Sequence, residues 1–86
     1  MSAAQQAGIL CGEPAFHQYL SEALPNYWEK ARVTGEDPYL QHRAAQTIRD
    51  ICGVKSRRDI DAQAETTWSE LVADYRAWMR QPEVVG

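Results

Sequence analysis

Residues that commonly carry chemistry are scarce in this sequence. Among its 86 residues it has two cysteines, Cys11 and Cys52, and two histidines, His17 and His42. Two cysteines are too few for a disulfide framework, and the Cys and His spacing of a tetrahedral zinc site is absent. We therefore expect both cysteines to be buried, reduced thiols, and we expect no metal site and no cofactor.

The sequence also lacks a catalytic constellation. A nucleophilic Ser, Cys or Thr needs a base within hydrogen-bond reach, and neither His17 nor His42 stands in such a pattern. None of the five glycines opens a phosphate-binding loop. The acids Glu65, Glu70 and Asp74 have the spacing of a solvated helix face. These absences predict that the protein is not an enzyme and that both histidines have structural or solvent-facing roles.

Long apolar runs are missing from the start of the chain. Residues 1–12 carry no Lys or Arg, and their apolar stretch, residues 9–11, is too short for a signal peptide or a membrane span. We expect a cytoplasmic protein that does not bind membranes. The net charge of −3 and the pI near 5.2 argue against non-specific binding of nucleic acids, which requires a basic face.

Signals for β-strands are missing as well. There is no run of alternating β-branched residues and no Asn-Gly or Asp-Gly hairpin turn. With 44% apolar residues, a chain of 86 residues can bury one core and no more. We predict an all-α fold, a compact bundle of three to four helices. In this prediction residues 13–82 form a single domain, residues 1–12 a flexible arm without periodicity, and residues 83–86 a tail.

Helical periodicity is clear in the first half of the domain. In residues 14–31 apolar side chains recur every three or four positions, and Pro25 lies inside the pattern. Either a kinked helix or two abutting helices fits this segment. A second helix begins with the pair Asp37-Pro38 and ends at Gly53, which supplies a left-handed cap.

The last third of the chain has the strongest helical pattern. Ser56 and Asp59 have the spacing of a capping box, so we expect the chain to re-enter a helix near Arg57. A stripe of apolar residues, rich in tryptophan, then predicts a helix over about residues 61–81. We expect this last helix to pack against the first one and to stabilise the core most.

The segment with the most chemical character is the turn that follows the second helix. Lys55, Arg57 and Arg58 surround this turn, and Arg49 precedes it on the helix. Together these cations could meet a phosphate backbone or an acidic protein surface. In the alternative interpretation, Arg57 and Arg58 only solvate the turn and pair with acids that are close in sequence, namely Asp50, Asp59 and Asp61.

Aromatic residues that remain exposed after folding are further candidates for partner binding, because aromatics and arginine dominate interface hot spots. We expect this exposure for Tyr27, Trp28 and Tyr39. The predicted partner-binding set is therefore Arg49, Lys55, Arg57, Arg58, Tyr27, Trp28 and Tyr39. A second copy of the chain is another option as partner, since a small core gains stability as a dimer.

Residues 45–60 are weakly similar to a helix-turn-helix, in which an Ala-rich helix ends at Gly-Val and a second helix follows. Arg49 stands where that motif usually has a small buried residue. Asp59 and Asp61 would approach DNA phosphates unfavourably. DNA binding through this segment is therefore kept as the alternative to protein binding.

Three features of the sequence carry a resemblance to a family. They are Phe16 with Leu20, the segment Ile-Arg-x-x-Cys-Gly-Val-x-Ser-Arg at residues 48–57, and a Trp-rich stretch at residues 68–78. Over residues 14–80 the chain resembles small proteins from the early regions of bacteriophages and prophages. The resemblance implies a phage context, in which such proteins bind and modulate enzymes of DNA metabolism or defence. It implies no catalytic residue. We expect a non-enzymatic inhibitor or adaptor whose partner is such a protein.

Overall fold

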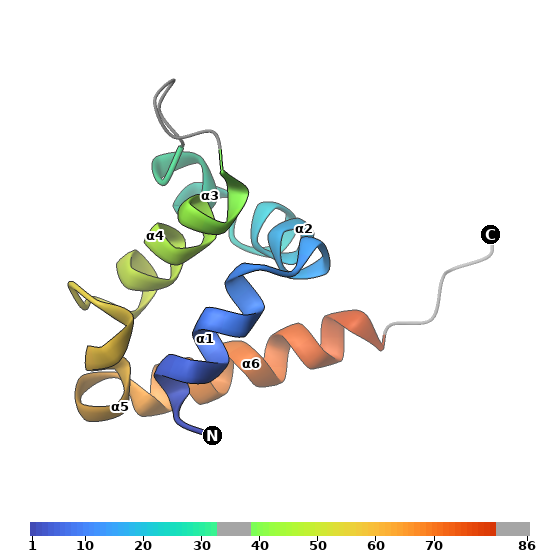
Figure 1. Cartoon of the computed structure of the whole chain (residues 1–86). Helices are drawn as coiled ribbons and strands as arrows, with labels where there is room; N and C mark the ends of the chain where they lie inside the picture. Colours follow the sequence, from blue (N-terminus) through green and yellow to red (C-terminus); the bar gives the residue numbers. More distant parts are fainter. Residues whose placement is uncertain (33–38, 81–86) are drawn as a thin grey trace, which may run out of the picture.

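The computed structural model describes residues 1–32 and 39–80, and every regular element within them is helical. The elements, shown in Figure 1, are α1 (Ala3–Cys11), α2 (Pro14–Ala23), α3 (Pro25–Lys30), α4 (Leu40–Cys52), the 3-10 helix η1 (Arg57–Asp59), α5 (Ile60–Gln63) and α6 (Glu65–Met79). The predicted all-α fold is confirmed. There are more helices than predicted, because the first and last predicted helices are each divided and the expected arm is helical. In the described part of the chain, no helix is both long and apolar enough to cross a membrane.

Helix α1 shows that the prediction of a flexible arm at residues 1–12 is wrong. A capping box closes its first turn: the Ser2 hydroxyl accepts from the Gln5 backbone N–H, and the Gln5 side chain accepts from the Ser2 backbone N–H. Ala7 and Cys11 are buried, and α1 packs against α4 and η1. Small side chains allow this close packing but give little hydrophobic periodicity, so the pattern alone does not reveal the helix.

The chain breaks at Leu24, immediately before Pro25, where the backbone leaves helical geometry with φ −130° and ψ 54°. Helices α2 and α3 are therefore two abutting helices, the second of the two predicted alternatives. The residue before a proline is disfavoured in the α conformation, which explains the position of the break. Helix α3 packs against α4, and this contact turns its Trp28 into the core.

Helix α4 ends where the sequence predicts. Gly53 has φ +68° and ψ 32°, a left-handed conformation, and the Val54 backbone N–H donates to the carbonyl oxygen of Arg49 at 3.0 Å. At the other end, the described helix begins at Leu40. The predicted start signal Asp37-Pro38 lies outside the described residues.

The segment between α4 and α6 differs from the prediction in two ways. The Ser56 side chain forms no capping hydrogen bond, so the predicted capping box with Asp59 is absent and the chain enters a 3-10 turn. The helix predicted over residues 61–81 is interrupted at Ala64, which has φ −143° and ψ 27°. Tertiary contacts set this geometry, because Ile60 is fully buried and the neighbouring Asp61 binds the N-terminus of α1.

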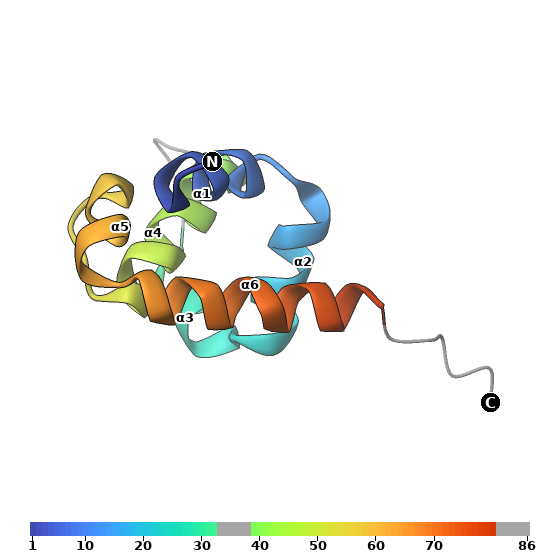
Figure 2. The same cartoon turned by 90° about the horizontal axis from the view of Figure 1, so that it is seen from below.

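The core is built on α6, which crosses the whole width of the molecule in Figure 2, with α5 at its N-terminal end. An aromatic cluster joins it to α2: the rings of Phe16 and Tyr75 meet edge to face at 4.9 Å between centroids, and those of Tyr19 and Trp78 meet at 5.7 Å. The predicted packing of the last helix against the first is confirmed. Nearer the start of α6, Trp68 is buried beneath α1 and donates its indole N–H to the side chain of Gln6 at 2.9 Å.

Candidate functional site

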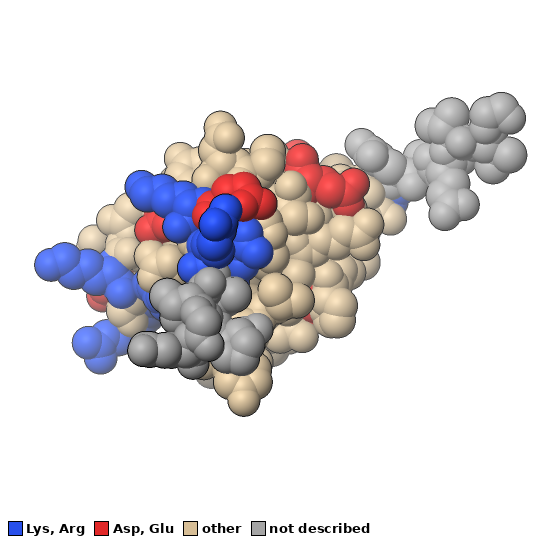
Figure 3. All heavy atoms as spheres, turned by 90° about the horizontal axis from the view of Figure 1, so that it is seen from above, with Lys and Arg blue, Asp and Glu red and all other residues tan. Residues whose placement is uncertain are grey.

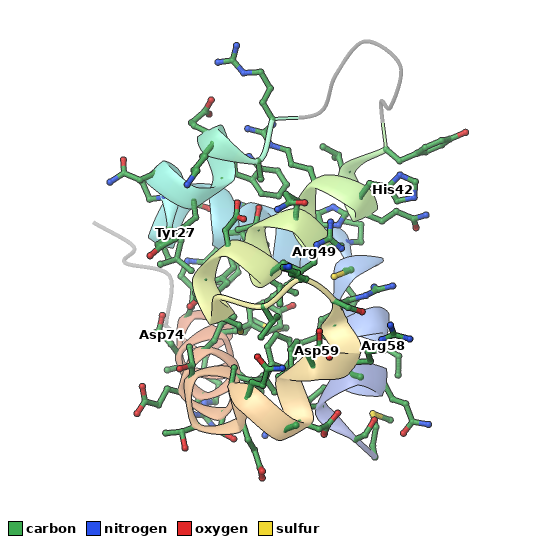
Figure 4. All side chains as sticks on the ribbon, turned by 90° about the vertical axis from the view of Figure 1, so that its left-hand side faces the viewer. Tyr27, His42, Arg49, Arg58, Asp59 and Asp74 are labelled. Carbon is green, nitrogen blue, oxygen red and sulfur yellow. The ribbon has the colours of Figure 1, made fainter. Side chains whose placement is uncertain are left out.

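Four cations gather at the end of the molecule formed by the C-terminus of α4, the Gly53 turn and η1. We call this surface the basic face, and it consists of Arg49, Lys55, Arg57 and Arg58. In the view of Figure 3, Lys and Arg side chains gather on one half of the molecule, with Asp and Glu side chains among them. Figure 4 looks onto this end and shows Arg49 near the centre of the view and Arg58 lower and to its right, with Asp59 beside Arg58. The left-handed Gly53 reverses the chain, and the η1 turn follows within four residues, so local backbone geometry brings these cations together.

The cations of the basic face form no salt bridge, among the described residues, with the acids that are close in sequence. Salt bridges between described residues join Glu29 to two arginines outside the face, Arg32 and Arg43. Of the three acids considered as partners, Asp50 accepts a hydrogen bond from Gln46, and Asp61 accepts two from the backbone of α1. The third, Asp59, forms no salt bridge with a described residue. The structure therefore does not support the interpretation that these arginines only pair with local acids.

Two of the four cations have specific contacts within the molecule. Arg49 donates from Nη2 to the side-chain oxygen of Gln46 at 2.7 Å, along the exposed side of α4. Arg57 turns toward α1, where its Nη1 atom lies 3.8 Å from the position that a Cβ atom on Gly8 would occupy. Lys55 and Arg58 are exposed. The face therefore combines two solvent-facing cations, one cation bonded to Gln46 on α4 and one cation held against α1.

Arg57 also acts on the thiol of Cys11, which lies one turn along α1 from Gly8. Burial raises the pKa of the Cys11 thiol, whereas a hydrogen bond from Arg57 and the positive charges of Arg57 and Arg49 oppose that rise. Burial also raises the pKa of the half-buried Cys52. Both cysteines are free thiols, as predicted, but only Cys11 is fully buried. Neither has the lowered pKa of a reactive cysteine.

A cleft opens between α1, α4 and η1. Its volume is about 270 Å³, and its walls are Gly8 and Cys11 of α1, Gln41, His42 and Ala45 of α4, and Arg57 of η1. We call it the α1–α4 cleft. Sequence reasoning missed it because residues 1–12 were expected to form a flexible arm, and an arm cannot supply a wall. No sequence signal reveals the cleft, because a glycine is ordinary in a segment expected to be a flexible arm. Gly8 becomes informative only inside α1, where it disfavours the helix by about 0.5–1 kcal/mol relative to Ala.

The three predicted aromatic residues do not form one surface. Tyr27 and Tyr39 are exposed at 40% and 62%, as expected, but Trp28 is only 7% exposed, so the prediction for Trp28 is wrong. Its indole stacks on the His17 ring at 6.1 Å between centroids, and the Arg43 guanidinium lies over it at 4.2 Å. Arg43 also donates to the Trp28 carbonyl oxygen at 2.9 Å, which fixes this arrangement.

The two exposed tyrosines lie in different places. Figure 4 shows Tyr27 on the opposite side of the view from His42 and Arg58. Tyr39 instead lies next to the α1–α4 cleft, because its ring meets the edge of His42 at 5.5 Å and His42 lines the cleft. Of the predicted aromatics, Tyr39 is therefore the one that the structure places beside a cleft.

Neither histidine has the geometry of a general base paired with a described nucleophile. The His17 Nε2 atom lies 2.6 Å from the carbonyl oxygen of Cys11, so this ring ties α2 to the end of α1. His42 contacts the Tyr39 ring. Within residues 1–32 and 39–80, no three His, Cys, Asp or Glu side chains are grouped so that they could hold a metal ion.

Comparison with protein-family models, with curated proteins and with solved structures gives no match. The likeness to small phage proteins therefore stays a prediction from sequence. The candidate site consists of the basic face and the neighbouring α1–α4 cleft, which share Arg57.

Proposed function

We propose that the protein is a non-enzymatic binding protein whose basic face docks onto an acidic surface of a partner protein. One observation carries this proposal: none of the salt bridges between described residues includes Lys55, Arg57 or Arg58, although three carboxylates are close in sequence. Cations that are not held in salt bridges accelerate association with a surface of opposite charge and select against like-charged partners.

The fixed backbone of the basic face supports a docking role. Arg49 is held by Gln46, and the turn after α4 is fixed by the left-handed Gly53 and by the hydrogen bond from Val54 to the last turn of the helix. A surface that is already ordered loses less conformational entropy on binding, so more of its interaction energy contributes to affinity. Guided by the resemblance to phage proteins, we propose as partner a protein of nucleic-acid metabolism or defence, which this chain inhibits or adapts.

The geometry favours a protein partner over DNA. A helix-turn-helix needs a second helix that can lie in the major groove. Here α4 is followed by the three-residue η1 and the four-residue α5, in which Ile60 is fully buried. The net charge of −3 also opposes a general attraction to the phosphate backbone. Direct DNA binding is therefore an outcome of the test and not a second proposal.

The test is capture of a partner from a lysate of the cell in which the protein is found, with and without nuclease treatment. Tagged wild type is compared with the double variant Lys55→Glu/Arg58→Glu and with Lys30→Glu/Arg76→Glu, which changes the net charge equally at exposed positions on α3 and α6. We expect the wild type and the second variant to capture the same protein. The first variant should lose it by roughly tenfold or more, since charge reversal replaces attraction with repulsion.

Two results would contradict the proposal. Equal capture by Lys55→Glu/Arg58→Glu and by the wild type would show that the basic face does not bind the partner. Capture that disappears on nuclease treatment, together with a salt-sensitive shift of DNA by the pure protein, would assign the face to nucleic acid instead.

A further inference from the structure

We propose that the α1–α4 cleft receives a carboxylate side chain, Glu or Asp, of an acidic peptide segment in the partner, with Arg57 as its counter-ion. This inference rests on the proposed function and names the group that the partner inserts. The cleft adjoins the basic face through Arg57, which belongs to both. A partner that docks on the exposed cations Lys55 and Arg58 therefore brings its own acidic residues to the entrance of the cleft.

The cleft is large enough for one side chain. Its volume of about 270 Å³ lies below the range of roughly 300–1,000 Å³ that is typical of sites for whole ligands. A glutamate side chain has few heavy atoms and needs only a narrow entrance. Cys11 and Ala45 supply a weakly polar part of the wall, against which its methylene groups can pack.

The charge of the cleft selects an anion. Arg57 is the one charged residue among those that line it, and no Asp or Glu is among the lining residues. Gln41 adds a side-chain amide that can donate a hydrogen bond from the opposite wall. A guanidinium matches a carboxylate with two parallel hydrogen bonds, and such pairs are stronger than neutral ones. One lining cation balances one carboxylate, whereas a phosphate monoester carries about −1.5 to −2.

Gly8 keeps the guanidinium accessible from α1. A Cβ atom at this position would be in ordinary contact with Nη1 of Arg57 at 3.8 Å, so an alanine fits, but a longer side chain would extend over the cation. The helix geometry at Gly8 does not itself require glycine, because the one positive φ among described residues is at Gly53. Access to the Arg57 guanidinium therefore explains the glycine at position 8, which helix stability does not explain.

The test uses two capped peptides, acetyl-Ala-Val-Glu-Val-Ala-amide and its Glu→Gln counterpart, titrated into the ¹⁵N-labelled full chain and followed by amide chemical shifts. We expect the Glu peptide to shift the amides of the cleft residues with millimolar affinity. The Gln peptide should bind about tenfold more weakly or not at all, because it cannot form the charged pair. Inorganic phosphate is the third probe and should shift these amides less than the Glu peptide does.

Variants separate the cleft from the rest of the basic face. Arg57→Gln should lower the affinity for the Glu peptide by about tenfold, and Gly8→Leu should do so by filling the cleft. Gly8→Ala and the matched control Arg58→Gln should stay within about twofold of the wild type. The amide spectrum of each variant shows whether it is folded, and Arg57→Gln keeps the test decisive if Gly8→Leu does not fold.

Three results would overturn the proposal: equal affinity for the Glu and Gln peptides, equal losses from Arg57→Gln and Arg58→Gln, or cleft shifts with phosphate but not with about 10 mM Glu peptide. These results are distinct from failure of the proposed function. Peptide binding at the cleft can succeed even where lysate capture does not depend on Lys55 and Arg58, and capture can depend on them where the cleft binds no peptide.

Discussion

Two tyrosines of the aromatic cluster place their hydroxyl groups against carboxylates. Tyr19 donates to Asp74 at 2.6 Å, and Tyr75 donates to Glu13 at 3.3 Å. The rings belong to the core, whereas the acids lie nearer the surface. Because each hydroxyl donates to a carboxylate, it is not buried without a hydrogen-bond partner, which would be costly. Burial, together with the neighbouring Asp74, raises the pKa of Tyr19 far above its ordinary value. The pKa of Tyr75 is raised by burial and by Glu13.

We expect Tyr19→Phe to lower the free energy of unfolding at neutral pH by about 1–2 kcal/mol, because the hydrogen bond to Asp74 is lost. A raised pKa in the folded state means that the contribution of the neutral phenol is complete below about pH 10, the pKa of an unfolded tyrosine. It is lost as the pH rises from there toward the higher pKa of the folded state.

Urea unfolding followed by tryptophan fluorescence between pH 8 and about pH 11.5 measures this effect. The pKa values of Cys11, Cys52 and Tyr75 are also raised by folding, so ionisation of these groups likewise lowers the free energy of unfolding as the pH rises. The wild type should therefore lose stability over this alkaline range. Above pH ~10 the free energy of unfolding of Tyr19→Phe should fall less than that of the wild type. Identical pH dependence in the two proteins would show that the bond between Tyr19 and Asp74 does not link stability to pH.

At the scale of elements, α1 is held by contacts with residues that lie far away in sequence. The backbone N–H groups of Ala3 and Ala4 donate to the two carboxylate oxygens of Asp61 at 2.8 and 3.1 Å. Gln6 accepts from the indole of Trp68. A carboxylate at a helix N-terminus satisfies free N–H groups and interacts favourably with the helix dipole. Asp61, on α5, thus holds the first turn of α1 in place.

Asp61→Ala should therefore destabilise the protein by about 1–2 kcal/mol, which is the usual effect of losing a helix cap. Hydrogen exchange of the α1 amides should become faster, while exchange in α6 changes little. Glu70→Ala, which removes an exposed carboxylate from α6, is the matched control and should leave α1 protected. Unchanged exchange of Ala3 and Ala4 in Asp61→Ala would refute the capping role.

At the scale of the whole molecule, α1 belongs to the same core as the longer helices. Ala7 and Cys11 are members of the buried cluster that includes Trp68, and α1 also forms one wall of the α1–α4 cleft. A chain of 86 residues has little core to spare, so each packed element contributes a large part of its stability.

We expect a variant that lacks residues 1–12 to lose several kcal/mol of stability, because Trp68 becomes exposed and its indole N–H loses Gln6. For a domain of this size the midpoint of thermal unfolding should fall by on the order of 10–20 °C. Circular dichroism during heating measures the midpoint, and a red shift of tryptophan emission reports the exposed indole. An unchanged midpoint is the result that a flexible arm would give.

The sequence by itself determined the helical class, a kink or break of the first helical segment at Pro25, the end of α4 at Gly53 and the cations around the following turn. Each of these depends on interactions within about four residues or on backbone preferences of single residues, which a sequence pattern displays directly.

Only the tertiary structure decided that residues 1–12 form a packed helix, that Trp28 is buried between His17 and Arg43, and that a cleft exists. The contacts responsible join residues far apart in sequence, such as Ala3 and Asp61 or Gln6 and Trp68. Small residues such as Ala7 and Gly8 carry no periodic signal of their own. Their role appears only when another helix comes close enough to use the space that they leave.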